Sequence, residues 1–220
     1  MNPNYSYIDT ELSAVNSILG SIGQAPTQSL DLENPEVHLA YNILQECLID
    51  VLNEGWSFNR EEGITLSPED VNGYIRIPPN ILRCDISKGQ THKTTDVVIR
   101  NGRLYDKIKH TDKFTEDVDV DVVWLFGFEV DLTSGSTGSL DVGQNIPEVF
   151  KRYIIAKSSA KAAVQLVNNP QLFQMLRQEE TLTRAACIEY ECDQGDYSYF
   201  GTPNKTVYES YQPYRTLSRI

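Results

Sequence analysis

The sequence predicts an α+β fold: helices from both chain ends form an antiparallel bundle, an antiparallel β-sheet or sandwich is inserted between them, and an extended arm follows. Apolar residues recur at helical spacing near both ends of the chain, whereas short apolar runs between turn formers fill its middle. The last residues are aromatic but aperiodic. The expected segments are the N-terminal half of the bundle at 1–55, the β insertion at 56–144 with a loop at 133–144, the C-terminal half of the bundle at 145–194, and the arm at 195–220.

Two helices are expected before Gly55. The first runs from about Ser6 to Ile22, where Asp9 or Thr10 can cap the free backbone N–H groups. The second begins at Asn34-Pro35-Glu36, because asparagine caps a helix and proline suits its first turn. Each carries an apolar stripe that can cover other helices.

The β insertion is expected to be antiparallel. Asn101-Gly102 lies between two short apolar runs and is the strongest hairpin signal in the chain. Pro78-Pro79-Asn80 marks another turn. The Gly/Ser-rich segment 133–144 is predicted to be a mobile loop. The apolar runs expected to form strands are 74–77, 81–86, 97–100, 103–105 and 118–128.

Two further helices are expected after Asn145. Pro147 suits the first turn of one, which continues to about Val167, and Asn168-Asn169-Pro170 ends it and begins the next. A connection this short places the two helices antiparallel, and both need a further surface over their apolar stripes. The stripe of the last helix comprises Leu172, Met175, Leu176, Leu182, Ala185, Ala186 and Ile188.

Composition and charge limit the possible functions. The chain of 220 residues is 40% hydrophobic and 23% charged, as expected of a soluble globular protein. It shows no membrane-spanning run and no signal peptide, so we expect it to stay in the cytoplasm where it is made. A net charge of −12 repels phosphate and disfavours tight DNA binding, although DNA could slide past such a surface.

Candidate chemistry is weak. The four cysteines form no Cys-x-x-Cys pair and are expected to be buried thiols, so neither a metal nor a cofactor site is predicted. The acidic run 117–121 begins like a calcium loop but lacks the glycine that such a loop needs. The acid pairs Glu61-Glu62 and Glu179-Glu180 are interpreted as solvated faces, because adjacent residues do not place two carboxylates around one bond. Residue chemistry alone therefore indicates a protein that is not an enzyme.

Several runs carry a family resemblance. They are Glu11 to Asn16, Leu19 to Pro26, Gly55 to Leu66, and Glu148 to Tyr197 with its Gln178-Glu179-Glu180 and Cys187 to Glu191 motifs. In these runs the chain resembles the tail tubular protein A family, the head-to-tail adaptor of short-tailed, podovirus-type bacteriophages. Residues 132–144 look like an insertion relative to the family pattern, and the chain after Phe200 does not match it.

The resemblance implies a structural virion protein of the phage tail, assembled in the host cytoplasm. Its copies would form a dodecameric ring between the portal protein and the tail nozzle protein, with a tail fibre as a further candidate partner and no membrane contact. Double-stranded DNA would pass through the ring without specific binding. The acid pairs leave one alternative, a tail-associated hydrolase acting on glycans of the host envelope. The residues expected to contact the portal or a neighbouring subunit are Tyr197, Tyr199, Phe200, Tyr208, Tyr211, Tyr214 and Arg215.

Overall fold

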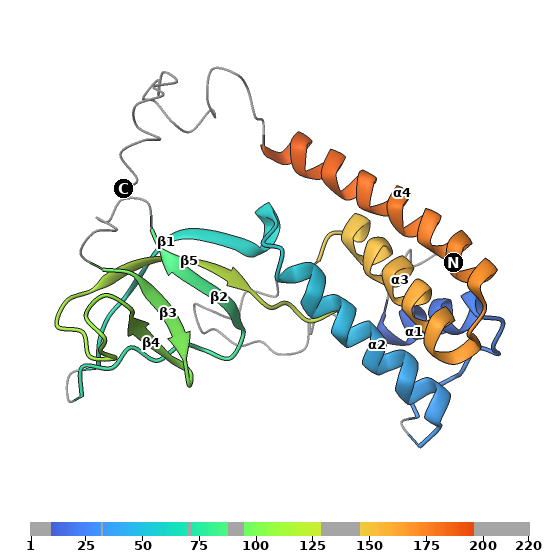
Figure 1. The fold of residues 1–220 in the computed structure, drawn as a ribbon, viewed down its shortest axis with the longest axis horizontal. Helices are drawn as coiled ribbons and strands as arrows, with labels where there is room; N and C mark the ends of the chain where they lie inside the picture. Colours follow the sequence, from blue (N-terminus) through green and yellow to red (C-terminus); the bar gives the residue numbers. More distant parts are fainter. Residues whose placement is uncertain (1–9, 32, 70–71, 88–94, 129–145, 196–220) are drawn as a thin grey trace, which may run out of the picture.

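The computed structural model describes residues 10–31, 33–69, 72–87, 95–128 and 146–195. It confirms the predicted α+β class, with the helices gathered at one end of the molecule and the strands at the other (Figure 1). The loop 133–144 and the arm after Gly195 lie outside the described residues. The elements are α1 (Glu11–Ser21), α2 (Pro35–Leu52), the 3-10 turn η1 (Ser57–Asn59), β1 (Arg60–Leu66), β2 (Ile81–Ile86), β3 (Val97–Arg100), β4 (Arg103–Asp106), β5 (Val118–Trp124), α3 (Glu148–Ala162), the π-helix η2 (Ala163–Val167) and α4 (Pro170–Gly195).

The first two helices begin at the predicted caps. Thr10 Oγ1 accepts a hydrogen bond from Ser13 N at 3.1 Å, and Asn34 Oδ1 accepts one from Glu36 N at 3.1 Å. The connection between the helices is tied back by Asn16, whose side-chain amide donates to Thr27 O and accepts from Thr27 N. These bonds satisfy backbone groups that would otherwise be left open at the helix ends.

Helix α3 is the centre of the bundle, because α1, α2 and α4 all pack against it. Phe150, near its start, is fully buried and lies 4.9 Å from the ring centre of Trp56 and 5.8 Å from that of Tyr190. Helices from both ends of the sequence therefore share one hydrophobic core.

The last two helices confirm the predicted break at Asn168-Asn169-Pro170 and differ from the expectation where the first of them ends. The α-helical part of α3 ends at Ala162, and its last turn widens into the π-helix η2. Asn168, with φ of 50°, then reverses the chain, and Asn169 Oδ1 caps α4 by accepting from the backbone of Gln171 and Leu172. Lys151 of α3 is fully buried: its Nζ lies 3.2 Å from Glu148 Oε1 and 5.5 Å from the ring centre of Phe128.

The strands form a three-stranded antiparallel sheet, ordered β1-β5-β2, and a two-stranded hairpin, β3-β4. The hairpin is the one predicted at Asn101-Gly102, whose φ values of 52° and 70° are those that a tight primed turn requires. The run 74–77 forms no full strand and makes only isolated bridges, from Tyr74 to Lys113 and from Arg76 to Arg103. A second hydrophobic core lies among these strands.

The chain passes from bundle to sheet at Trp56 and Asn59. Trp56 Nε1 donates to Val51 O at 2.9 Å, and the Trp56 side chain is buried. Asn59 is fully buried: its Oδ1 accepts from Trp56 N at 2.9 Å, and its Nδ2 donates to Leu52 O at 2.8 Å and Trp124 O at 3.0 Å. One amide thus connects α2, η1 and the end of β5.

Candidate assembly surface

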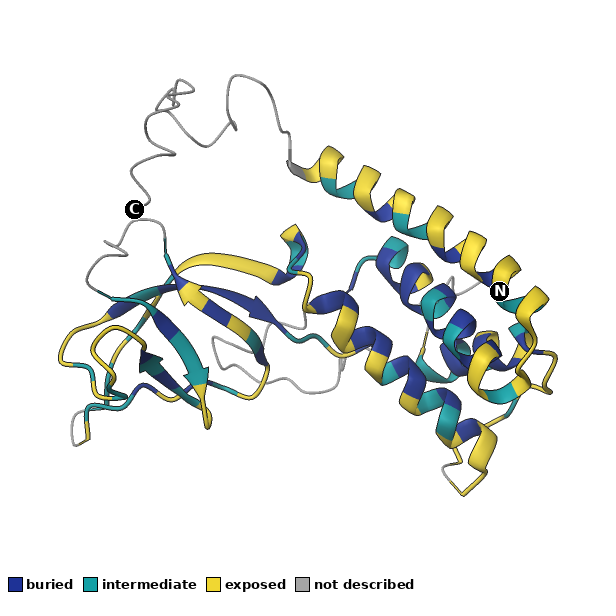
Figure 2. Ribbon diagram, in the orientation of Figure 1, coloured by how far each residue is buried: buried dark blue, intermediate teal, exposed yellow. Residues whose placement is uncertain are grey.

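The residues predicted to form an interface lie in the arm, outside the described residues, so their contacts stay a prediction. Within the described part of the chain, α4 has the most exposed large apolar side chains. Met175 is 69% exposed and Leu182 is 72% exposed. Figure 2 shows that α4 is exposed along most of its length on the side turned away from α3.

Helix α4 has two different sides. Leu176, Glu180 and Cys187 are buried, and their helical spacing places them on the side that packs against α3. Met175 and Leu182 are seven residues apart on the opposite side, which we call the outward face. Its residues are Met175, Glu179, Leu182, Ala185, Ala186 and Glu189, all exposed.

The predicted stripe of α4 is therefore only partly buried, which corrects the expectation that other helices cover it. Of its members, Leu176 is buried and Leu172 is half-buried, whereas Met175, Leu182, Ala185, Ala186 and Ile188 are exposed. The reason is geometric: the stripe is wide, and α4 packs against α3 along one side only. Its outer residues have no cover within the described part of one copy.

Contacts that sequence reasoning missed hold α4 on the bundle. The Arg184 guanidinium donates to both Glu54 carboxylate oxygens at 2.9 Å and to Tyr153 Oη at 2.7 Å. These hydrogen bonds, first of all those to Glu54, raise the pKa of Arg184. Two turns further along the helix, Glu191 accepts from Ser57 N at 3.0 Å and from Ser57 Oγ at 2.9 Å. Both partners are far away in sequence, so no local pattern reveals them, although Glu191 and Ser57 both lie in runs that carry the resemblance.

A groove of about 320 Å³ lies where α2, α3, η2 and α4 meet. We call it the bundle groove. Its charged side chains form ion pairs, Lys157 with Asp50 at 3.6 Å and Arg177 with Glu180. It is lined by Cys47, Asp50, Lys157, Ala160, Lys161, Val164, Gln165, Phe173, Arg177 and Glu180.

Lys161 at the bundle groove also has a partner on α2. Its ammonium pairs with Glu46, and the hydrogen bond to that carboxylate raises the pKa of Lys161. Each of the three cations of the groove therefore lies beside an acid.

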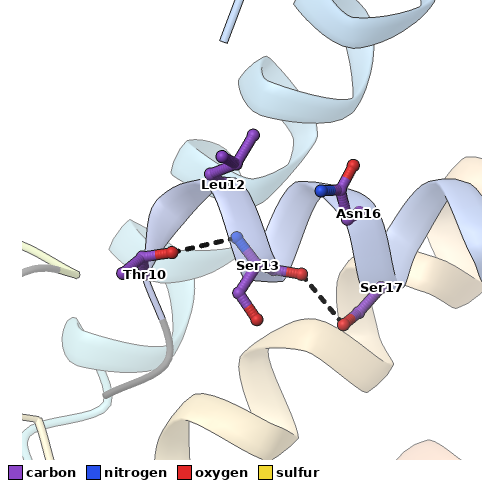
Figure 3. A pocket seen from close by; sticks show the side chains of 5 residues that line it. All are labelled: Thr10, Leu12, Ser13, Asn16 and Ser17. Carbon is purple, nitrogen blue, oxygen red and sulfur yellow. Dashed lines mark hydrogen bonds between the residues drawn. The ribbon is translucent and has the colours of Figure 1, made fainter. Parts of the chain in front are cut away.

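A second, shallow pocket lies along α1 and is lined by Thr10, Leu12, Ser13, Asn16 and Ser17 (Figure 3). Its polar side chains largely serve the backbone, as the caps and the bond from Ser17 Oγ to Ser13 O at 2.9 Å illustrate. The described residues that line this pocket include no acid, base or thiol.

Four of the acids in the pairs Glu61-Glu62 and Glu179-Glu180 and in the run 117–121 have structural partners as follows. Glu61 Oε2 accepts from Trp124 Nε1 at 3.0 Å, and Glu180 pairs with Arg177 inside α4. Asp119 accepts from Thr65 Oγ1 at 2.6 Å, and Asp121 accepts from Gly63 N at 3.1 Å. These strand acids thus help to hold β1 on β5.

Among the described residues, no group of three or more His, Cys, Asp or Glu side chains could hold a metal ion. Cys47, Cys84 and Cys187 are buried as expected, whereas Cys192 is exposed, which corrects the expectation for that thiol. No helix among these residues is long and apolar enough to cross a membrane.

Comparison with known proteins supports the resemblance. A family model described as tail tubular protein matches residues 12–197, a span that runs from α1 past the end of α4. Tail tubular protein A of Klebsiella phage KP34 is 29% identical over 119 residues, which cover 54% of this chain and 61% of that relative. This chain thus spans about three fifths of the relative's length. The match to the family model covers both helical ends and the sheet, and the chain belongs to the tail tubular protein family.

Proposed function

We propose that this chain is a head-to-tail adaptor, whose copies form a ring between the portal and the tail nozzle of a short-tailed bacteriophage. Membership of the tail tubular protein family makes it a structural protein of a phage tail. The observation that carries the finer proposal is the outward face of α4, where Met175 and Leu182 are about 70% exposed in one copy. Large apolar side chains exposed on one face of a helix are typical of a surface that binds another protein.

A ring is the assembly that fits these observations best. A head-to-tail contact between identical chains closes into a ring when its rotation closes, whereas a contact between two identical surfaces stops at a dimer. The ring proposed here is dodecameric, as the resemblance implies. Its net charge of −12 per chain would weakly repel DNA in the central channel and let it pass without specific binding.

The arm is proposed to make the contacts beyond the ring. Tyrosine and arginine are enriched where proteins meet, and the arm contains Tyr208, Tyr211, Tyr214 and Arg215. We assign these, with Tyr197, Tyr199 and Phe200, to contacts with the portal or a neighbouring subunit. The nozzle protein would bind the other side of the ring, and a tail fibre protein is a further candidate partner.

Reconstitution with purified portal protein tests this proposal. We expect the chain to join portal rings coaxially in electron micrographs, and the nozzle protein to bind portal rings only when the chain is present. Portal rings incubated with the nozzle protein alone are the control. Nozzle binding in that control, or a chain that never joins the portal, would contradict the adaptor role.

A further inference from the structure

We infer that the outward face of α4 in one copy docks into the bundle groove of the next copy. This inference rests on the proposed ring and names the two surfaces that would join its neighbours. It commits to a second copy of this chain as the occupant of both surfaces.

The first argument is the placement of the two surfaces on α4. Phe173, Arg177 and Glu180 line the bundle groove, whereas Met175 and Leu182 belong to the outward face. A helix turns about 100° per residue, so Phe173 and Met175 are about 200° apart around the axis, as are Glu180 and Leu182. The two surfaces therefore look in nearly opposite directions from the same helix. That arrangement is the one a head-to-tail contact needs, because each copy must offer one surface forward and another backward.

The second argument is charge. The cations of α4 are Arg177 and Arg184, and both are bound to acids away from the outward face. The outward face itself carries Glu179 and Glu189. The bundle groove has three cations, Lys157, Lys161 and Arg177, and each is paired with an acid, Asp50, Glu46 and Glu180 respectively. The two lysine pairs are partly exposed, so their ammonium groups can also reach the acids of an incoming helix face.

The third argument is apolar fit. Ala160, Val164 and Phe173 line the bundle groove, and Val164 is 48% exposed in one copy. Met175 and Leu182 could enter this groove and bury apolar surface on both copies. The exposed ion pairs around the groove contribute little to the stability of one copy, so their lysines can pair again with Glu179 or Glu189 of a neighbour. Two outward faces meeting each other would instead bring acids together without a cation.

Four variants test the inference. Leu182→Glu and Met175→Glu alter the outward face, Val164→Glu alters the bundle groove, and Ile108→Glu is the matched control, an exposed apolar residue (45%) outside the helices. All four side chains are at solvent, so circular dichroism and thermal unfolding should show folded chains. Light scattering of a concentration series would then measure assembly. We expect the first three changes to raise the concentration for half assembly about tenfold or more, and Ile108→Glu to leave it unchanged.

A mixing experiment distinguishes a head-to-tail contact from a contact between two identical surfaces. Leu182→Glu keeps an intact groove and Val164→Glu keeps an intact outward face, so an equal mixture should form a one-to-one dimer and stop there. Assembly lost in Leu182→Glu but normal in Val164→Glu would overturn the head-to-tail pairing in favour of α4 meeting α4. Normal rings from all variants would overturn the inference and leave the adaptor proposal standing. An unmodified chain that forms no ring, alone or with its portal, would overturn both.

Discussion

Replacing Asn59 with alanine tests how the bundle is joined to the sheet. The Asn59 side chain makes three hydrogen bonds to the backbone, with Trp56 N, Leu52 O and Trp124 O, in a fully buried site. Alanine keeps the fold of the chain but leaves these backbone groups without their partner. At about 1 kcal/mol for each bond, the free energy of unfolding should fall by about 3 kcal/mol. For a chain of this size, that is a fall in Tm of roughly 6–12 °C.

Urea unfolding followed by tryptophan fluorescence is a suitable assay, because both tryptophans of the chain contact this joint: Asn59 bonds to backbone atoms of Trp56 and Trp124. Asn53→Ala is the matched control, since Asn53 is exposed at the end of α2. It should change stability by less than about 0.5 kcal/mol. If the free energy of unfolding of Asn59→Ala also stays within about 1 kcal/mol of that of the unmodified chain, the Asn59 amide does not hold the bundle to the sheet and the reasoning is refuted.

Four further predictions concern the buried lysine, the Cys84 thiol, the order of thiol labelling and the arm. Lys151→Met should leave the free energy of unfolding unchanged or raise it by about 1 kcal/mol or more. The reason is that burying the ammonium costs more hydration free energy than its ion pair with one half-exposed acid gains. A clearly lower free energy of unfolding in urea would contradict this prediction. Burial raises the pKa of the Cys84 thiol to about 12, above its ordinary value of 9.0, so the thiol stabilises the fold below pH 9 and this stabilisation is lost as the pH rises towards 12. Cys84→Ala should therefore make the free energy of unfolding fall less between pH 9 and 12. The same pH dependence of stability in the variant and the unmodified chain would refute the raised pKa of Cys84. A thiol reagent at neutral pH should label the exposed Cys192 before the buried Cys47, Cys84 and Cys187, as measured by mass spectrometry of the labelled peptides. Equally fast labelling of the buried thiols would contradict this prediction. A chain truncated before Tyr197 should still fold but should fail to assemble with its portal. Normal assembly of the truncated chain with the portal would show that the arm is not part of the interface.

Local signals predicted much of the fold. Asn34-Pro35, Asn101-Gly102 and Asn169-Pro170 act through neighbouring backbone groups, and each marks a helix start or a turn where the structure has one. Element types could therefore be assigned from the sequence, although the π-helix after Ala162 could not, because its residues differ little from those of an ordinary helix turn.

Long-range features could not be predicted in the same way. The bonds of Arg184 to Glu54 and of Asn59 to Trp124 join residues far apart in sequence. The burial of Lys151 is an exception to the rule that charged residues face solvent. The periodicity of α4 predicted an apolar stripe but could not show that the outer half of this stripe is exposed. The arm residues Tyr197 to Arg215 lie outside the described part of the chain and stay a prediction.

The proposed ring is tested most directly by electron microscopy of the purified chain, alone and with its portal protein, together with the mass of the particles. We predict closed rings of identical subunits around a central channel, with a mass that is a whole multiple of 24.9 kDa. A chain that remains a monomer at every concentration, and beside its portal, would contradict the account.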